Sequence, residues 1–199
     1  NAVNSNKWTA LHEAAMVGQV DAVKVLLQNG ADVNAVQCNH WTALHLAASN
    51  GRVNVAKVLI QNDADVNAVN ENKFTALHFT AKNGHVDVAK VLIQNGADVN
   101  AVEKGTWTAL QLAASRKHIR CTLQLLCFGA EIDENTIKFD TRLRLIESRL
   151  KLLRSGKRMG TSLLSDEERR FMWNLAYVLT IKHPAIAFGT YQRIRSFVT

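Results

Sequence analysis

The chain carries a four-residue sequence, Thr-Ala-Leu-His, that returns at a fixed interval. It stands at 9–12, 42–45 and 75–78, and a fourth copy that ends in Gln stands at 108–111, so the period is 33 residues each time. A fixed period between about 20 and 50 residues is typical of proteins built from stacked repeats, in which each unit contacts only its neighbours. The sequence therefore predicts a solenoid and not a globular enzyme with one central cleft.

Each copy of the repeat predicts the same pair of helices. Thr9 can act as the N-cap of a short helix, and His12 stands three residues later, where a capping-box partner would lie. A break at Gly18 is followed by apolar residues at helical spacing, and this second helix should end at Asn29–Gly30. One such helix pair cannot bury its apolar face alone, so we expect the stacking of neighbouring units to stabilise the fold.

The unit T-A-L-H-x-A-A, then G, then V-x-V-L-I/L-Q-N-G-A-D-V-N-A-V, resembles the ankyrin repeat. The resemblance covers residues 1 to about 135 and implies an all-α ankyrin-repeat solenoid of helix-turn-helix units with β-hairpin loops, capped by C-terminal helices. Asn1–Val3 matches the last residues of a unit, which predicts a further repeat upstream. The expected units are about 4–36, 37–69, 70–102 and 103–135.

Two departures from the family pattern concern the turns. Asp63 replaces the Gly that ends the second helix elsewhere, and Asp accepts the left-handed conformation only at some cost, so the second unit should end less stably. The hairpin Gly of the family, two residues before the Thr, is also replaced, by Lys7, His40, Lys73 and Thr106. The residues one position earlier all tolerate positive φ, so we expect them to keep the turn. They are Asn6, Asn39, Asn72 and Gly105.

The repeat pattern fades in the fourth unit, and other helices follow it. Residues 136–158 predict a degenerate, basic capping helix with an apolar face towards the last repeat. Residues 159–199 predict a helical hairpin outside the repeat rule. Ser165 and Glu168 form a capping-box signature before an apolar stripe, and Pro184 suits the first turn of a last helix.

Composition narrows the class of protein and its location. No apolar run approaches the roughly 18 residues of a membrane span, and the first residues do not resemble a signal peptide. Cys38, Cys121 and Cys127 leave one thiol unpaired in any disulfide scheme, so we expect buried or half-buried thiols in a reducing compartment. The cytoplasm is the expected location, and the nucleus or, for a pathogen effector, the host cytosol are the alternatives.

The net charge of +7 is unevenly distributed. Residues 1–130 carry 11 Lys and Arg against 9 Asp and Glu, whereas residues 131–199 carry 13 against 8. The excess forms a basic stripe over 138–158, and a solvated helix face is its simplest interpretation. Nucleic-acid binding is not favoured, because aromatic residues do not interleave with these charges and no nucleic-acid motif is present. An acidic protein or an anionic membrane surface fits the stripe as well as nucleic acid does.

The repeated histidines do not predict a metal site. His12, His45 and His78 stand in successive units, about 10 Å apart. A zinc ion needs each His nitrogen about 2.0–2.1 Å from the metal, so no single ion can be shared between them. The sequence has neither a Gly-rich phosphate loop nor a nucleophile elbow, so we expect no enzyme activity, no metal and no cofactor. The carboxylates that recur with the period are turn residues first, and they are Asp32, Asp65 and Asp98.

An aromatic residue directly before each repeat Thr is the most useful functional signal. These residues are Trp8, Trp41, Phe74 and Trp107, which we expect to form a row on the hairpin tips. The resemblance implies that this position and the end of each first helix line a concave, protein-binding surface. Carried over to this chain, the helix-end residues are Met16, Val17, Ser49, Asn50, Lys82, Asn83, Ser115 and Arg116. Trp is enriched in interface hot spots; the alternative is that the rings only pack on neighbouring hairpins.

Two functions follow from these patterns. In the first, the chain is a non-enzymatic module that binds one protein partner. In the second, it is an adaptor whose residues 160–199 bind a second protein. Ankyrin proteins of poxviruses and intracellular bacteria resemble this arrangement, with a C-terminal F-box-like segment that recruits a ubiquitin ligase. The chain lacks the Leu-Pro opening of that segment at Ser162–Ser165.

Overall fold

The computed structural model describes residues 3–139, and these residues contain nine α-helices. The chain divides into two parts, residues 1–128 and residues 129–199. The predicted hairpin of 159–199, and most of the predicted capping helix of 136–158, lie outside the described residues. The helices of residues 1–128 are α1 (Ala10–Val17), α2 (Val20–Gln28), α3 (Ala43–Ser49), α4 (Val53–Gln61), α5 (Ala76–Asn83), α6 (Val86–Gln94), α7 (Ala109–Ser115) and α8 (Ile119–Cys127). The part that follows contains α9 (Glu134–Phe139).

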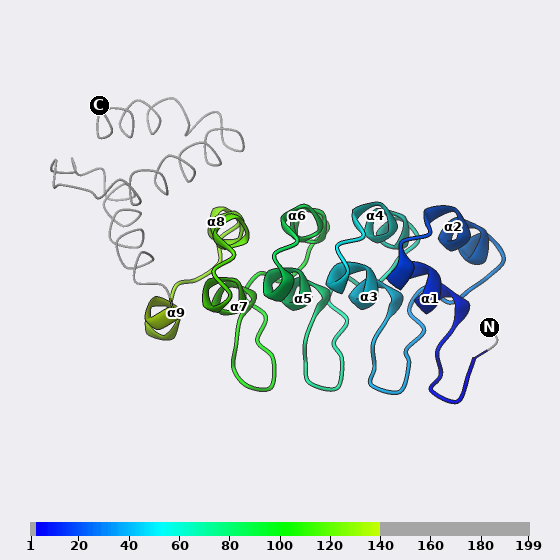
Figure 1. Cartoon of the computed structure of the whole chain (residues 1–199), viewed down its shortest axis with the longest axis horizontal. Coiled ribbons are helices and arrows are strands. Elements are labelled where there is room, and N and C mark those ends of the chain that lie inside the picture. The colour runs from blue at the N-terminus through cyan, green and yellow to red at the C-terminus, as the bar shows by residue number, and fades with distance from the viewer. Residues whose placement is uncertain (1–2, 140–199) are drawn as a thin grey trace, which may run out of the picture. The chain divides into compact units, whose positions relative to one another are not determined.

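Residues 3–128 form a two-layered stack of helix pairs. Helices α1, α3, α5 and α7 pack side by side as an inner layer, and α2, α4, α6 and α8 form the outer layer (Figure 1). The loops between pairs project beyond the inner layer (Figure 1). Residues 3–139 contain isolated β-bridges, Val3 to Thr9 and Val102 to Thr108, but no strand. The prediction of an all-α repeat solenoid is confirmed. No helix in this part of the chain is long and apolar enough to cross a membrane.

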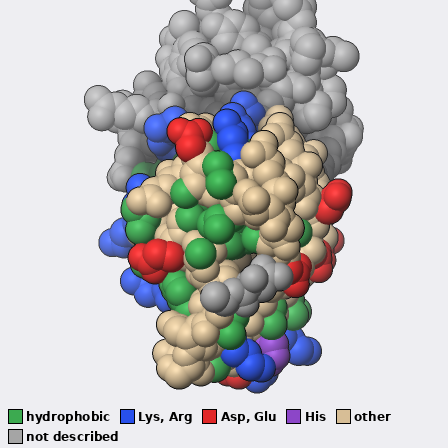
Figure 2. Space-filling model, turned by 90° about the vertical axis from the view of Figure 1, so that its right-hand side faces the viewer, with side chains coloured by type: hydrophobic (Ala, Val, Ile, Leu, Met, Phe, Trp, Pro, Cys, Tyr) green, Lys and Arg blue, Asp and Glu red, His purple; other side chains and the backbone are tan. Residues whose placement is uncertain are grey.

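Burial of the helices depends on the neighbouring repeat. Ala47 and Ala48 of α3 and Leu59 of α4 are fully buried between the pairs that flank them. Ala10 of α1 is exposed, whereas the equivalent Ala43 of α3 is only 1% exposed. Figure 2 looks onto the first repeat end-on and shows apolar side chains gathered on this face. The contrast fits a fold in which each repeat is stabilised by the next.

The Thr and His of the first three repeats cap the N-terminus of the inner helix, as predicted. In the second unit the backbone N–H of Thr42 donates to Nδ1 of His45 at 3.2 Å, and Oγ1 of Thr42 lies 2.9 Å from the same nitrogen. The other ring nitrogen, Nε2, lies 3.0 Å from the backbone carbonyl oxygen of Phe74 in the third unit. Because an amide donor faces Nδ1 and a carbonyl acceptor faces Nε2, the ring is neutral with its proton on Nε2. The capping residue therefore also joins two repeats.

The neutral state of these histidines is supported by their burial. Burial lowers the pKa of His12, His45 and His78, and it lowers the pKa of His45 to about 4, although bonds to backbone groups act in the opposite direction. Nε2 of His12 and of His78 bonds to the next repeat as His45 does, at 3.0 and 3.2 Å. In the fourth unit Oε1 of Gln111 accepts the Thr108 amide at 3.0 Å, so Gln can replace His in the cap.

The hairpin turns are kept, but the residue predicted to be left-handed is wrong. In the first hairpin the Lys7 amide donates to the Asn4 carbonyl at 2.9 Å, and the Asn4 amide donates to the Trp8 carbonyl at 3.2 Å. This is the pattern of a type I turn followed by a left-handed residue, which places positive φ one position later than we expected. The residues with positive φ are Lys7 (57°), His40 (57°), Lys73 (59°) and Thr106 (67°).

Replacing the left-handed residues with Gly should stabilise the repeats. Thr106 is the most strained, because it is β-branched at a φ of 67°. We expect Thr106→Gly to raise the free energy of unfolding by about 1 kcal/mol and Lys73→Gly to raise it by less. Asp63 adopts the predicted left-handed conformation, with a φ of 64°. Asp63→Gly should raise the free energy of unfolding by about 0.5 kcal/mol. Urea unfolding followed by circular dichroism measures these changes. Lys104→Gly, in the same hairpin as Thr106, is the control, and an equal gain there would contradict the explanation.

The periodic aspartates are turn residues, as predicted. Oδ1 of Asp32 accepts the amide of Asn34 at 2.9 Å, and Asp65 and Asp98 make the equivalent bond. The Asn34 side chain then joins the next repeat, donating to the Asp63 carbonyl at 3.1 Å and accepting the Asp65 amide at 2.8 Å. These carboxylates therefore belong to the scaffold.

The cysteines differ from one another in exposure. Cys121 is buried in α8, and burial raises the pKa of its thiol to about 12, so this thiol is unreactive at neutral pH. Cys127 is half-buried. Cys38 is exposed in the second hairpin, which contradicts the expectation that all three are at least half-buried. The hairpin residues project beyond the helical layers, so no neighbouring helix covers the Cys38 side chain.

Candidate protein-binding surface

The ends of the four inner helices form a row of side chains that we call the inner-helix ridge. The four helices pack side by side, so equivalent residues at their ends come into line. In each repeat the first ridge residue is half-buried and the second is exposed. The structure thus brings together the predicted helix-end set. The ridge consists of Met16, Val17, Ser49, Asn50, Lys82, Asn83, Ser115 and Arg116.

Hydrogen bonds from the following repeat hold the backbone of the ridge in place. Each donor is the side chain of the N-cap residue directly before the outer helix of the next repeat, and each acceptor is the carbonyl of a half-buried ridge residue. The spacing of the ridge is therefore set by the scaffold and not by a bound partner. The bonds join Arg52 Nε to Met16 (3.1 Å), His85 Nε2 to Ser49 (3.1 Å) and His118 Nε2 to Lys82 (3.1 Å).

Glycines next to the ridge make room for these donors. Gly51 has a φ of 68°, and a β carbon added there would lie 2.8 Å from Nδ1 of His85. Gly84 has a φ of 76°, and a β carbon there would lie 2.7 Å from Nδ1 of His118. Lys117 takes the same place in the fourth unit at a φ of 59°. Gly is thus required where the next outer helix approaches.

The side chains of the ridge differ in how much they are already engaged. Nδ2 of Asn83 donates to the Ser49 carbonyl at 2.8 Å and lies 3.3 Å from its hydroxyl, so this pair partly satisfies itself. Val17 is 44% exposed. Lys82 and Arg116 form no ion pair within the described part of the chain. These last three side chains are the ones best placed to meet a partner.

We expected the four aromatic residues before the repeat Thr to form a row on the hairpin tips, but their side chains do not project there. All four are half-buried, and they lie between the turn and the inner helix. The Trp8 ring lies 5.5 Å from the His12 ring, and the Phe74 ring lies 5.5 Å from the His78 ring. Their aromatic faces are therefore partly used by the capping histidines.

A residue that the sequence argument missed joins two of these rings. Phe79 in α5 is 7% exposed, and its ring lies 4.3 Å from that of Trp41 and 5.3 Å from that of Phe74. The signal was a departure from the repeat, because Phe79 stands where other units have Glu or Leu. Trp41 and Phe74 consequently contribute to packing, so replacing them changes stability as well as any binding surface.

The described residues show no arrangement suited to metal chemistry. Within residues 3–139 no group of three or more His, Cys, Asp or Glu is placed to hold a metal ion. The repeated histidines use both ring nitrogens in hydrogen bonds of the scaffold, as shown for His45. The shifted pKa values in this part of the chain belong to buried scaffold groups, namely three of the capping residues and Cys121.

A stack of helix-turn-helix units with fixed spacing, and with an exposed ridge whose side chains change from unit to unit, defines a helical-repeat scaffold of the binding type. The family model for ankyrin repeats, which describes three copies, matches residues 1–70 and again residues 64–136. The chain belongs to the ankyrin-repeat family, as the resemblance implied. A search of curated proteins found no match.

Proposed function

We propose that the chain is a non-enzymatic interaction module that binds a protein partner across the inner-helix ridge and the adjoining hairpins. Ankyrin repeats are in general protein–protein interaction modules. The observation that supports this surface is a contrast between repeated and varied positions. The capping residues hardly change from unit to unit, whereas the ridge pairs are Met-Val, Ser-Asn, Lys-Asn and Ser-Arg.

The contrast has a physical basis in the contacts of the two sets. The repeated residues make the bonds between neighbouring units, so the stack limits their identity. Exposed ridge side chains such as Val17 and Arg116 form few contacts with the stack, and their identity determines the surface that a partner meets. Because the scaffold fixes this surface before binding, little ordering entropy opposes association.

A charge placed on the ridge should weaken partner binding. Val17→Asp removes an exposed apolar contact on the ridge and adds a charge that a partner would bury, so we expect binding to weaken by about tenfold or more. The proteins that co-purify with the full chain from cells that express it serve as the ligand, and titration against the purified partner measures the change.

The matched control is Val25→Asp on the outer helix α2, where the side chain is 55% exposed. This variant should bind the partner as the wild type does, and both variants should unfold at the same urea concentration as the wild type. Equal binding by all three proteins would contradict the proposal. Ala variants of Trp41 and Phe74 are less suitable, because both rings pack on Phe79.

The adaptor function is a further hypothesis that rests on a different part of the chain. Its second docking site, residues 160–199, lies outside the described residues. The basic stripe of 138–158, for which nucleic acid or an anionic surface was the alternative ligand, lies almost entirely outside them too.

A further inference from the structure

We propose that the partner segment recognised by the inner-helix ridge is extended and acidic, with carboxylates over the third and fourth repeats and an apolar side chain over the first. The inference rests on the proposed function, because it specifies the chemistry of the ligand at the same surface. It is drawn from the distribution of charge over the two layers, from the contacts of the acidic side chains, and from the order of residues along the ridge.

Charge is separated between the two halves of the repeats. The hairpin and inner-helix halves, 4–19, 37–52, 70–85 and 103–118, carry seven Lys and Arg against three Glu. The remaining parts of residues 1–130 carry four Lys and Arg against six Asp. The half that presents the ridge thus has a net charge of +4, and the other half has a net charge of −2. A ligand that approaches the ridge meets a positive field, which favours an acidic partner.

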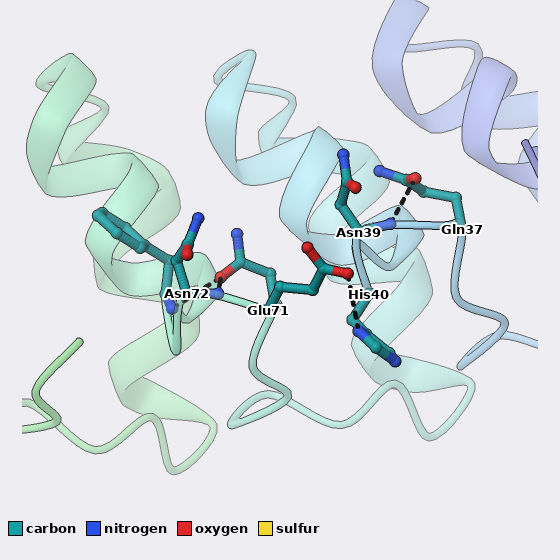
Figure 3. Close-up of polar contacts among 7 residues, drawn as sticks. Gln37, Asn39, His40, Glu71 and Asn72 are labelled. Carbon is teal, nitrogen blue, oxygen red and sulfur yellow. Dashed lines mark hydrogen bonds and ion pairs between the residues drawn. The ribbon is translucent and has the colours of Figure 1, made fainter. Parts of the chain in front are cut away.

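The three glutamates on the ridge side are already engaged. Oε2 of Glu13 accepts from Trp8 Nε1 at 3.1 Å, and Glu103, which is 9% exposed, accepts the Trp107 amide at 3.1 Å. Glu71 extends from the third hairpin towards His40 of the second, with 3.9 Å between Oε1 and Nδ1 (Figure 3). None of these three glutamates forms an ion pair with Lys82 or Arg116.

Within residues 3–139, the basic ridge residues Lys82 and Arg116 form no ion pair. Among the described residues, the acidic side chains close to a basic one are Asp21 beside Lys24 and Glu71 beside His40, the second an ion pair only when His40 is protonated. Neither pair includes Lys82 or Arg116. Lys82 is half-buried at the end of α5, and Arg116 is exposed directly after α7, which packs on α5. Carboxylates of a partner would supply the missing counter-charges.

The chemistry of the ridge changes in one direction along the stack. It begins with Met16 and Val17, passes through the polar pair of the second unit, and ends with Lys82 and Arg116. Packed helices lie about 10 Å apart, so the apolar end and Arg116 are separated by about 30 Å. An extended chain covers this distance with about nine residues, which sets the spacing between the apolar residue and the carboxylates of the ligand.

A protein segment fits this surface better than a single-stranded nucleic acid. Nucleic-acid binding without sequence preference uses aromatic rings as stacking platforms for bases. Here Trp41 and Phe74 pack on Phe79, and Trp8 packs beside His12. The ridge pair of the first repeat, Met16 and Val17, has no donor for a phosphate, whereas it can contact a Leu or Val side chain of a peptide.

The test is a titration of the full chain with capped synthetic peptides of about 12 residues, read by fluorescence anisotropy. One peptide carries Leu near one end and a run of Glu near the other, and a permuted peptide has the same composition with Glu in the centre. We expect the first peptide to bind more tightly than the permuted one, and a version with Lys in place of Glu not to bind. Affinity should fall as NaCl is raised from about 50 to about 200 mM.

Charge reversal on the ridge supplies the matched variants. Lys82→Glu with Arg116→Glu should weaken the Leu-Glu peptide by at least tenfold. Lys57→Glu with Lys90→Glu makes the same charge change at exposed sites of the outer helices α4 and α6, and should weaken it less than threefold. Absence of peptide binding at low salt, or equal losses in the two double variants, would overturn the inference. Tighter binding of oligo-dT that Lys82→Glu with Arg116→Glu abolishes would overturn it in favour of nucleic acid.

The outcomes separate this inference from the proposed function. If the acidic peptides do not bind but the purified partner is lost on Val17→Asp, the ridge binds a protein of other chemistry and only the inference fails. If partner binding is the same for Val17→Asp and the wild type, the proposed function itself fails.

Discussion

Acidification from about pH 7 to about pH 4.5 should destabilise the repeats by roughly 2–3 kcal/mol through His45 alone. Burial lowers the pKa of this ring to about 4, against 6.5 for an unperturbed His. Between these values the unfolded chain binds the extra proton and the folded chain does not. Stability is therefore complete above about pH 6.5 and falls as the pH is lowered towards 4. Protonation of Nδ1 would also set an N–H against the Thr42 amide.

Comparison with a variant that has no imidazole isolates this effect from the titration of carboxylates. His45→Gln introduces the residue that the fourth unit already uses in its cap, where Oε1 of Gln111 accepts the Thr108 amide. Urea unfolding at several pH values should show a shallower pH dependence for this variant than for the wild type. The same loss of stability in both proteins between pH 6.5 and 4 would show that His45 is not the group that titrates.

Gly51→Ala should lower the free energy of unfolding by about 2–3 kcal/mol. The new β carbon would stand at a φ of 68° and 2.8 Å from Nδ1 of His85. The left-handed conformation costs about 1 kcal/mol for Ala. Displacement of His85 would weaken its 3.1 Å, partly buried bond to the Ser49 carbonyl, which costs about 1–2 kcal/mol more.

Gly96→Ala provides the matched control for this substitution. Gly96 has a φ of 88°, and an added β carbon there would meet nothing within 4 Å. This variant should lose only the conformational part, about 1 kcal/mol. The difference between the two variants measures the contact between repeats. Equal losses in urea unfolding would mean that the approach of His85 to Gly51 does not stabilise the stack.

The sequence was sufficient to predict the scaffold, because its pattern is local and periodic. Four copies of Thr-Ala-Leu-His or its Gln variant marked the inner helices, and the capping box and the turn aspartates such as Asp65 followed from residues two or three positions apart. The family model agrees with this prediction. The alignment of the helix-end residues into one ridge also follows from the period alone.

Features that depend on contacts between repeats could not be predicted in the same way. The bond from His45 to the Phe74 carbonyl joins residues 29 positions apart, and the Phe79 ring lies between Trp41 and Phe74 of two different hairpins. Residue preferences also placed the left-handed turn residue at an Asn. The hydrogen bonds of the type I turn place it at the next residue, which is Lys7 in the first hairpin.

Photo-crosslinking tests the central claim, that a protein partner lies on the inner-helix ridge, most directly. A benzophenone amino acid is introduced at Asn50, which is exposed on the ridge, or at Lys57, which is exposed on the outer helix α4 of the same repeat. With the partner bound, the account predicts a covalent adduct with the partner from position 50 and none from position 57. An adduct from position 57 without one from position 50 would contradict it.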